Sequence, residues 1–323
     1  MRDYSRSIQY YGPAYFGPTE VQAESFLFTT HGCPYQCVFC ACPALFRGSY
    51  RAYAPERVVD EIEELVARGC HVFSFRDDTF CLERDRVIRI CGDIVDRGLS
   101  ISWFAQVRVD LLDEELVKHM RRAGCREAGF GVESGSPRVL RRLKKNINVE
   151  KVVEAVRWLK SWGILPAAYF MYGHPDETRE DLEQTIRLIR QVIAEGGVVH
   201  WPMAAVPYPG TELLRYAREG GLLCDSELVD YRTEVVADRA PCYVPPGLDE
   251  SDYRAYLSAV HDSWRTSVRR MGGLRWRLAP WQTFFYYCRK ATSPKAWQQH
   301  ISRMRRSRQI KAAASPQRAF PEQ

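Results

Sequence analysis

Short β-rich runs alternate with longer stretches of helical periodicity six times between residues 25 and 206. The β-rich runs cover residues 25–29, 71–75, 101–107, 127–132, 166–172 and 198–206. Apolar residues recur at three- and four-residue spacing over residues 55–68, 83–97, 113–122, 137–143, 149–162 and 179–195. Six strand-helix units in a row require right-handed crossovers and a parallel sheet. The pattern predicts an α/β fold whose sheet is either curved into a partial barrel or doubly wound.

Reactive and charged side chains gather just after the expected strands. Cysteines follow the first strand, and the next four strands are followed in turn by Asp77 and Asp78, Arg108, Glu133 and His174. The carboxyl ends of parallel strands meet at one edge of a sheet, and in both architectures that edge carries the site. We therefore expect these side chains to lie close together.

The formal net charge of +6 hides two oppositely charged parts. Residues 263–323 contain 14 basic residues and one acidic residue, whereas residues 1–262 contain 32 basic and 39 acidic residues. The larger part is slightly acidic, which is compatible with a cationic substrate, and the smaller part is strongly basic. No apolar run reaches 18 residues and the N-terminus is polar, so we expect a cytoplasmic protein without a membrane span.

Three of the 11 cysteines crowd into the segment HGCPYQCVFC, where Cys33, Cys37 and Cys40 have the spacing C-x3-C-x2-C. The odd total and this crowding favour metal ligation over a disulfide framework. Three thiolates on one short loop suit a cubane iron-sulfur cluster and leave one of its four irons open to a small molecule. The alternative is a zinc site with Cys42 as the fourth ligand, although the Cys40-Ala-Cys42 step gives poor tetrahedral geometry.

The cysteine segment resembles the signature of the radical S-adenosylmethionine (SAM) superfamily, including the aromatic Phe39 before the third cysteine. The resemblance covers roughly residues 25–215 and includes DEIEELVARGCHVFSFRDDTF, FAQVRVDLLDEELVKHMRRAGCREAGFGVESGSPRVL, MYGHPDET and PYPGTELL. Together these segments resemble the core of the cobalamin-type and methylthiotransferase-like branches. The resemblance implies a partial (β/α)6 TIM-like barrel of the radical SAM type with a mostly helical C-terminal extension. It also implies a [4Fe-4S] cluster whose electron cleaves SAM to a 5'-deoxyadenosyl radical.

Four regions follow from this resemblance and from the composition. They are an N-terminal extension (1–24), the core barrel (25–215), a substrate-side or capping region (216–300) and a basic flexible tail (301–323). Basic and aromatic residues interleave in SWRTSVRRMGGLRWRLAPW, and basic residues cluster in ISRMRRSRQIK. Such segments either cap the open side of a barrel or bind an anionic surface such as RNA or a membrane.

By the same resemblance, Phe39 lies against the adenine of SAM and Asp77 and Asp78 hold its amino group. A carboxylate suits that task because a half-buried ammonium needs a charge-assisted partner. The alternative is that the aspartates cap the following helix. The resemblance gives Glu133 polar contacts to SAM, and Arg108 can bind a carboxylate of SAM or substrate through a bidentate fork. These two residues can also form a salt bridge with each other.

Three further residues are candidates on the substrate side. His174, in a segment that departs from the family's usual Gly-Leu-Pro-Gly-Glu-Thr form, is either an acid-base group or a surface loop histidine. Tyr208 follows the sixth expected strand, where the family lines the substrate side. Cys242 is either a hydrogen-atom donor to a substrate radical or a buried free cysteine. Thr178 and Asp181 predict a helix cap close to a capping box.

The sequence leads to a first hypothesis and to alternatives. The first is hydrogen abstraction from a small polar substrate, such as a sugar or aminoglycoside-like natural product, for epimerisation or dehydrogenation. The alternatives are a cobalamin-type radical SAM methyltransferase whose cobalamin domain is missing or separate, a tRNA-modifying radical SAM enzyme, and a zinc-stabilised binding protein. The enzymatic hypotheses require SAM, the cluster and an electron donor such as flavodoxin or ferredoxin, and cobalamin belongs only to the methyltransferase.

Overall fold

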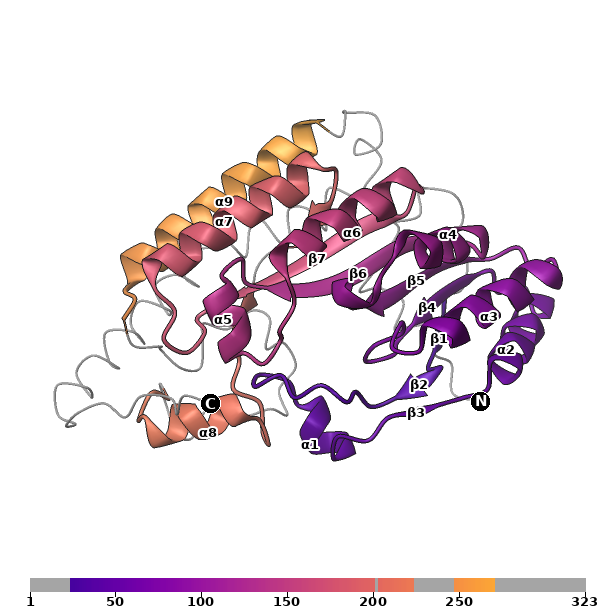
Figure 1. Cartoon of the computed structure of the whole chain (residues 1–323), viewed down its shortest axis with the longest axis horizontal. Helices are drawn as coiled ribbons and strands as arrows, with labels where there is room; N and C mark the ends of the chain where they lie inside the picture. The colour runs from indigo at the N-terminus through magenta and orange to yellow at the C-terminus, as the bar shows by residue number, and fades with distance from the viewer. Residues whose placement is uncertain (1–23, 201–202, 224–246, 271–323) are drawn as a thin grey trace.

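A parallel, curled half-barrel sheet forms the centre of the protein (Figure 1). The computed structural model describes residues 24–200, 203–223 and 247–270. The strands lie in the spatial order β1, β4, β5, β6, β7, β8, and β9 pairs with β7; all of these pairs are parallel. The strands are β1 (Glu24–Leu27), β4 (Val72–Phe75), β5 (Ser102–Val107), β6 (Cys125–Glu133), β7 (Leu165–Tyr172), β8 (Val198–Val199) and β9 (Met203–Ala204). The predicted α/β partial barrel is confirmed.

Helices connect the strands, and α9 runs alongside α7 on the outside of the fold (Figure 1). The connecting helices are α2 (Pro55–Ala67), α3 (Arg84–Asp96), α4 (Glu114–Arg122), α5 (Pro137–Arg142), α6 (Val149–Ser161) and α7 (Arg179–Ala194). Two more helices follow the last strand: α8 (Glu212–Glu219) and α9 (Glu250–Arg270). Within the described ranges, none of the helices has the length and apolar character needed to cross a membrane.

The sequence periodicity predicts the long elements well but misses three short ones. The expected sixth strand is two short strands, β8 and β9. The small antiparallel pair β2 (Thr30–His31) and β3 (Arg51–Ala52), and the helix α1 (Cys42–Phe46), were not expected. The two residues of β2 or of β3 make a single alternation of a strand, and the five residues of α1 make less than two turns of a helix, so these elements carry no measurable period.

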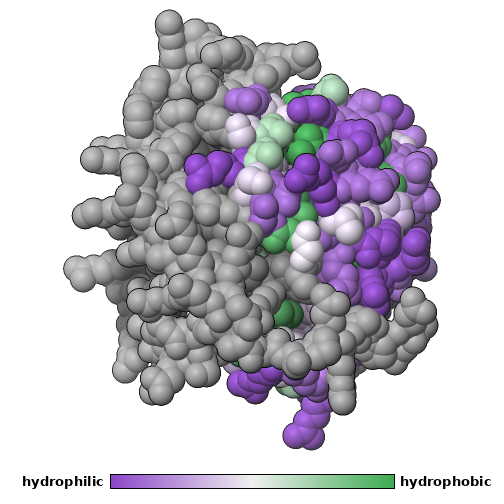
Figure 2. All heavy atoms as spheres, turned by 90° about the vertical axis from the view of Figure 1, so that its left-hand side faces the viewer, coloured by the Kyte–Doolittle hydropathy of each residue, from purple (hydrophilic) through white to green (hydrophobic). Residues whose placement is uncertain are grey.

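Aromatic residues fill much of the core beside β4 and β5. The rings of Phe75 and Phe80 stack with centroids 4.9 Å apart, and Trp103 meets Phe75 edge-on at 5.1 Å. All three side chains are fully buried, and Trp103 Nε1 donates to the Ala123 carbonyl at 2.8 Å. Each buried side chain of this size contributes about 1.5–3 kcal/mol to folding. On the face shown in Figure 2, by contrast, the described residues are mostly hydrophilic.

The division into an extension, a core, a capping region and a tail stays a prediction. The expected core boundary at residue 215 falls inside α8, and α9 supplies a helix in the expected capping region. The extension up to residue 23 and the tail beyond residue 270 lie outside the described residues.

Candidate active site

The three motif cysteines lie on the loop between β2 and α1, which we call the cluster loop (residues 32–41). Cys33 Sγ is 3.4 Å from Thr79 Oγ1, just past the carboxyl end of β4. Cys37 Sγ is 3.9 Å from the carbonyl oxygen of Lys144, which follows α5. The three thiols are free and partly exposed. The structure therefore places Cys33, Cys37 and Cys40 at the edge of the sheet where the site was expected.

Backbone contacts hold the cluster loop from two sides. The Val38 amide donates to the Leu143 carbonyl at 3.1 Å, and the Leu213 amide at the start of α8 donates to the Val38 carbonyl at 2.9 Å. Gly32 has a φ of +84°, and a Cβ there would lie 2.0 Å from the Ser49 carbonyl oxygen. Glycine is required at this position because the backbone approaches closely and lies in the left-handed region.

The donor set fits an iron-sulfur cubane better than a zinc ion. Within the described ranges, no three His, Cys, Asp or Glu side chains are placed to hold one metal ion. A cubane does not need such convergence, because each thiolate binds a different iron. The Cys42 amide donates to Cys40 Sγ at 3.4 Å, a contact that stabilises a thiolate. Cys42 itself is buried, and burial raises its pKa to about 12, which argues against it as a fourth ligand.

The two aspartates after β4 have different surroundings. Asp77 is buried and accepts hydrogen bonds from the Thr29 and Thr30 amides and from Thr29 Oγ1, each at 2.7 Å. Asp78 is exposed and accepts a hydrogen bond from the Gly32 amide at 3.0 Å. The Asp77 carboxylate therefore already bonds the segment that follows β1 to the end of β4, whereas the Asp78 carboxylate is exposed beside the cluster loop. Neither aspartate caps α3, whose cap residue is Glu83.

Arg108 is buried and its hydrogen-bonding fork is occupied. Its Nε and Nη2 donate to Asp110 at 3.1 and 3.0 Å, and Nη2 also donates to the Lys145 carbonyl at 2.9 Å. Its guanidinium carbon lies 3.7 Å from the ring centroid of Tyr35 on the cluster loop. Arg108 thus ties β5 to the cluster loop and to the segment after α5, and its proposed role as a carboxylate fork stays a prediction.

Glu133 pairs with Lys145 instead of with Arg108. Lys145 Nζ lies 3.1 Å from Glu133 Oε1, and the two side chains are only 10% and 8% exposed. Glu133 has a φ of +68°, a left-handed conformation that costs a non-glycine residue about 1–3 kcal/mol. A Cβ on Gly131 would lie 2.1 Å from Glu133 Oε1, so this glycine makes room for the pair. The possible salt bridge between Arg108 and Glu133 is absent, since each has another partner.

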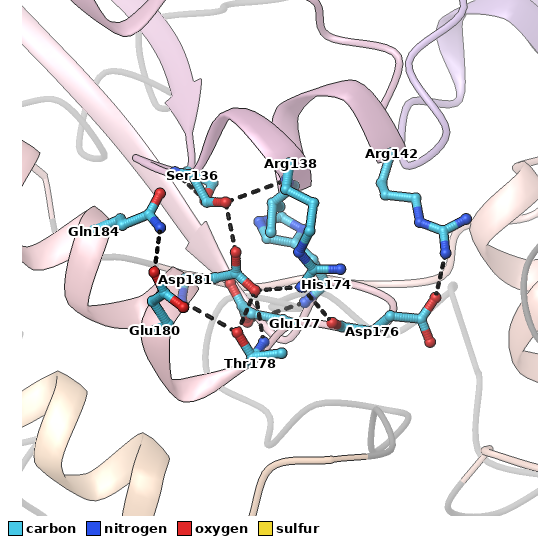
Figure 3. A network of polar contacts seen from close by, with 12 residues as sticks. Ser136, Arg138, Arg142, His174, Asp176, Glu177, Thr178, Glu180, Asp181 and Gln184 are labelled. Carbon is cyan, nitrogen blue, oxygen red and sulfur yellow. Dashed lines mark hydrogen bonds and ion pairs between the residues drawn. The ribbon is translucent and has the colours of Figure 1, made fainter. Parts of the chain in front are cut away.

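A polar network joins the start of α5 to the loop between β7 and α7 (Figure 3). Asp181 is at its centre and accepts hydrogen bonds from Ser136 Oγ at 2.5 Å and Thr178 Oγ1 at 2.6 Å, and it pairs with Arg138. Thr178 and Asp181 form a full capping box on α7, which confirms the predicted cap. Close packing supports the network, because a Cβ on Gly135 would lie 2.5 Å from the Gln184 carbonyl. The ends of β6 and β7 are thus held together.

His174 is fully buried in this region, so its interpretation as a surface loop histidine is wrong. Burial lowers its pKa to about 4, and the imidazole is therefore neutral at physiological pH. The neighbouring Glu177 accepts a hydrogen bond from the Gly173 amide at 2.7 Å, and burial raises its pKa to about 8. Both side chains lie near the network of Asp181 (Figure 3). An acid-base role for His174 stays a prediction.

The remaining predicted residues are dispersed. Phe39 is half-buried and packs against two apolar clusters, one containing Val139 and the other Leu213. Tyr208 is exposed, and its carbonyl accepts the Thr211 hydroxyl at 2.6 Å. Cys242 lies outside the described residues.

Several residues of the site were not expected from the sequence. They are Tyr35, Thr79, Asp110, Arg138 and Lys145. Lys145 is the last residue of the basic run RRLKK at the end of a helix. Such a run is typical of solvent-exposed charge, so nothing in the sequence marks Lys145 as buried. Gly131, two residues before Glu133, was the available signal, since a glycine inside a strand often marks a close approach.

Comparison with known proteins identifies the same core. Residues 27–189 match the radical SAM superfamily. An uncharacterized methyltransferase, PH0819, from Pyrococcus horikoshii is 37% identical over 64% of this chain and 45% of its own length. The anaerobic magnesium-protoporphyrin IX monomethyl ester cyclase of Cereibacter sphaeroides is 31% identical over 74% of this chain and 40% of its own length. The chain thus spans less than half the length of these two relatives.

Among solved structures, the fold resembles that of TsrM from Kitasatospora setae, a radical SAM methyltransferase whose structure contains a tryptophan substrate and a SAM analogue. The TM-score is 0.60 at 21% sequence identity, and the match covers 76% of this chain and 52% of TsrM. A second TsrM structure, with cobalamin and a [4Fe-4S] cluster bound, matches with the same TM-score at 18% identity over 91% of this chain and 62% of that protein. At this identity the likeness supports the fold alone.

Proposed function

Because the chain belongs to the radical SAM superfamily, whose enzymes use a [4Fe-4S] cluster and SAM, we propose that it acts in a radical SAM methyltransferase. The observation that carries this proposal is the match of the core to PH0819, a protein named as a methyltransferase, together with the fold shared with TsrM. None of the relatives described above is named for epimerisation or dehydrogenation. The hydrogen-abstraction hypothesis, with Cys242 as donor and a sugar-like substrate, therefore has less support than methyl transfer to a small molecule.

In this proposal the thiolates of Cys33, Cys37 and Cys40 hold the cluster. The bound cluster supplies one-electron chemistry and a Lewis-acidic iron, and SAM supplies the methyl group. The protein keeps the three thiols on a loop fixed by the Val38 backbone contacts. The Cys42 amide donates a hydrogen bond to Cys40 Sγ and so stabilises the negative charge of the thiolate.

The groups around the cluster loop then orient SAM. Asp78 is the exposed carboxylate beside the cysteines and would pair with the ammonium of SAM. Glu133 would accept hydrogen bonds from SAM while its Oε1 remains paired with the ammonium of Lys145. Phe39 would offer an apolar face to the adenine. Asp77 and Arg108 act one step further away, because each fixes the loops that carry these groups.

Cobalamin enters the proposal as a methyl carrier held by another part of the protein or by a separate chain. No described residue is assigned to it. The proposal follows from the branch that the sequence segments resemble and from the cobalamin in the second TsrM structure.

Isotope labelling separates methyl transfer from hydrogen abstraction. The full chain, reconstituted anaerobically with iron and sulfide, is incubated with SAM carrying a deuterated methyl group and with cob(I)alamin as the methyl acceptor. We expect S-adenosylhomocysteine and deuteromethyl-cobalamin above the rate without protein, measured by mass spectrometry, and a Glu133→Gln variant should be slower. Formation of 5'-deoxyadenosine with no S-adenosylhomocysteine would support hydrogen abstraction and refute the proposal.

Iron and sulfide analysis tests the cluster assignment separately. We expect about four irons and four sulfides per chain, a stoichiometry that follows from the cubane. Cys40→Ala should lose most of both, whereas Cys42→Ala should keep them because Cys42 is a buried thiol rather than a ligand. One zinc and no sulfide in the wild-type protein would refute the assignment.

A further inference from the structure

The cluster loop is bonded to α8 on one side and to the segment after α5 on the other. The Leu213 amide of α8 donates to the Val38 carbonyl at 2.9 Å, and the Val38 amide donates to the Leu143 carbonyl at 3.1 Å. Val38 lies between Cys37, a proposed cluster ligand, and Phe39, the proposed contact of the adenine. The positions of these two neighbours therefore depend on both flanking segments.

An ion pair bridges the same two segments across the cluster loop. Lys144 Nζ lies 2.8 Å from Glu212 Oε2. Each of these residues is next in the sequence to a residue that bonds the Val38 backbone. Arg215 also approaches Glu212, at 3.9 Å, but it belongs to α8 itself and cannot replace the bridge.

Lys144 touches the cluster loop in a second way. Its carbonyl oxygen lies 3.9 Å from Cys37 Sγ, so its backbone meets the loop while its side chain spans it. Its φ is +53°, in the left-handed region that non-glycine residues seldom adopt. Such a conformation persists only where the surrounding structure holds it in place. Lys144 is therefore fixed at the point where the loop, α8 and the segment after α5 meet.

The helix α8 packs on a small apolar cluster of its own, and it lies apart from the helices that cover the sheet (Figure 1). Within the described ranges, no residue of α8 belongs to the main core. Phe39 packs against this small cluster and also against the cluster that contains Val139 and Leu143. A segment outside the main core opens at a lower free energy than the whole protein unfolds. Opening of α8 would therefore change the packing of Phe39 and leave the barrel folded.

An open groove of about 720 Å³ runs beside the ion pair and is lined in part by Cys37, Cys40, Lys144 and Glu212. The side chains of Lys144 and Glu212 are 39% and 23% exposed. A partly exposed ion pair stabilises a contact modestly and is screened by salt. The pair can thus break and form again, because water in the groove solvates both charges.

We propose that Lys144 and Glu212 are positioning residues, whose ion pair is a clasp that holds α8 against the cluster loop and so keeps Cys37 and Phe39 in place. This inference rests on the proposed function, which assigns Cys37 to the cluster and Phe39 to SAM. When the clasp opens, the Val38 carbonyl loses its donor and Phe39 loses one of its two apolar contacts. The clasp therefore determines how firmly the cluster and SAM are held, and it leaves the methyl-transfer step itself unchanged.

Hydrogen exchange followed by mass spectrometry measures the opening of α8 directly. The full chain reconstituted with its cluster is compared with Glu212→Gln, with Lys144→Met and with the double variant. Peptides from residues 32–41 and 210–219 report the clasp, and a peptide from residues 84–96 of α3 reports the barrel. Lys144→Arg keeps a cation that reaches Glu212. The matched control is Glu195→Gln, which breaks a partly exposed pair with Arg157, 2.6 Å away on α6.

We expect Glu212→Gln and Lys144→Met each to speed exchange in the cluster loop and α8 about three- to fivefold, as the loss of a partly exposed ion pair allows. Iron release to a chelator and the dissociation constant of SAM should rise by similar factors. The kcat per cluster at saturating SAM should change less than about twofold, because the clasp does not touch the reacting atoms. The double variant should match the single ones, since either substitution alone removes the pair. Lys144→Arg and Glu195→Gln should behave like the wild-type protein.

Exchange in the cluster loop and α8 that is equal in all variants would refute the clasp. Faster exchange that extends to α3 would also refute it, since the substitutions would then destabilise the whole barrel. A lower kcat at an unchanged SAM affinity would refute the positioning role. Absence of iron and sulfide from the reconstituted wild-type protein would instead refute the proposed function, and exchange in the cluster-free variants would still decide whether the ion pair holds α8.

Discussion

Lys145 provides the sharpest test of how the site is built. Its ammonium and the Glu133 carboxylate are 3.1 Å apart and almost completely buried. Replacing Lys145 by Met gives an unbranched side chain of similar volume, one atom shorter, and removes the charge. Glu133 then remains in the same buried position without its partner, because the left-handed backbone and the space beside Gly131 fix its place.

The expected loss of stability follows from this geometry. At 3.1 Å two unit charges attract by about 5 kcal/mol at an effective dielectric constant near 20, and desolvation of both groups offsets much of that. Removing one partner of a buried pair leaves the desolvation of the other uncompensated, which costs about 3–5 kcal/mol. We expect Lys145→Met to lower the free energy of unfolding by about 3 kcal/mol, a large part of the stability of an ordinary domain.

Urea unfolding of the cluster-free chain measures this change. A double-mutant cycle with Glu133→Gln should give a coupling energy of about 2 kcal/mol, because the second substitution removes the charge that the first leaves unpaired. The control is Lys151→Met, which breaks an exposed pair with Glu154 and should change stability by less than about 0.5 kcal/mol. A coupling energy near zero between Lys145 and Glu133 would refute the reasoning.

Three other substitutions test separate features. Burial raises the pKa of Glu127 to about 8 from 4.5, so the folded chain binds the extra proton and loses stability as pH rises through this window. Glu127→Gln should reduce that slope in urea unfolding between pH 5 and pH 8, and the remainder is the share of Glu177, whose pKa is raised in the same way. An unchanged slope would contradict it. Gly92→Ala, inside α3 with no atom within 4 Å of an added Cβ, should raise the free energy of unfolding by about 0.5–1 kcal/mol. Gly131→Ala should displace the Glu133 side chain, which lowers the free energy of unfolding by about 1–3 kcal/mol and weakens SAM binding measured by calorimetry. A SAM affinity equal to that of the wild-type protein would show that the added methyl group does not displace Glu133.

The sequence predicts those parts of the fold in which a local pattern repeats. The periodicity predicts a helix over residues 179–195, and α7 covers Arg179–Ala194 because its apolar positions recur over four turns and Thr178 caps its start. The same reasoning cannot find β2 and β3, because these strands form only where two residues of one pair with two residues of the other, about 20 positions further along the chain. Whether the sheet curls or lies open is likewise decided by how the strands pack together, and only the family resemblance indicated it.

The site shows the same limit. The cysteine spacing indicates the cluster loop because all three proposed ligands are within eight residues. The partners of Arg108 do not follow from spacing, since one is Asp110 nearby and the other is the carbonyl of Lys145, 37 residues away. The burial of His174 depends on what packs around the loop after β7, which no single position in the sequence records.

Lys145 also connects the two halves of the site. Burial raises the pKa of the Cys37 thiol, and the positive charges of Lys145 and Arg108 oppose that rise by stabilising the thiolate. The same ammonium holds Glu133, the carboxylate proposed to contact SAM. One buried cation therefore balances a proposed cluster ligand on one side and a proposed SAM contact on the other. Because a buried charge is retained only where partners compensate it, the loss of Lys145 removes a favourable interaction from both groups at once.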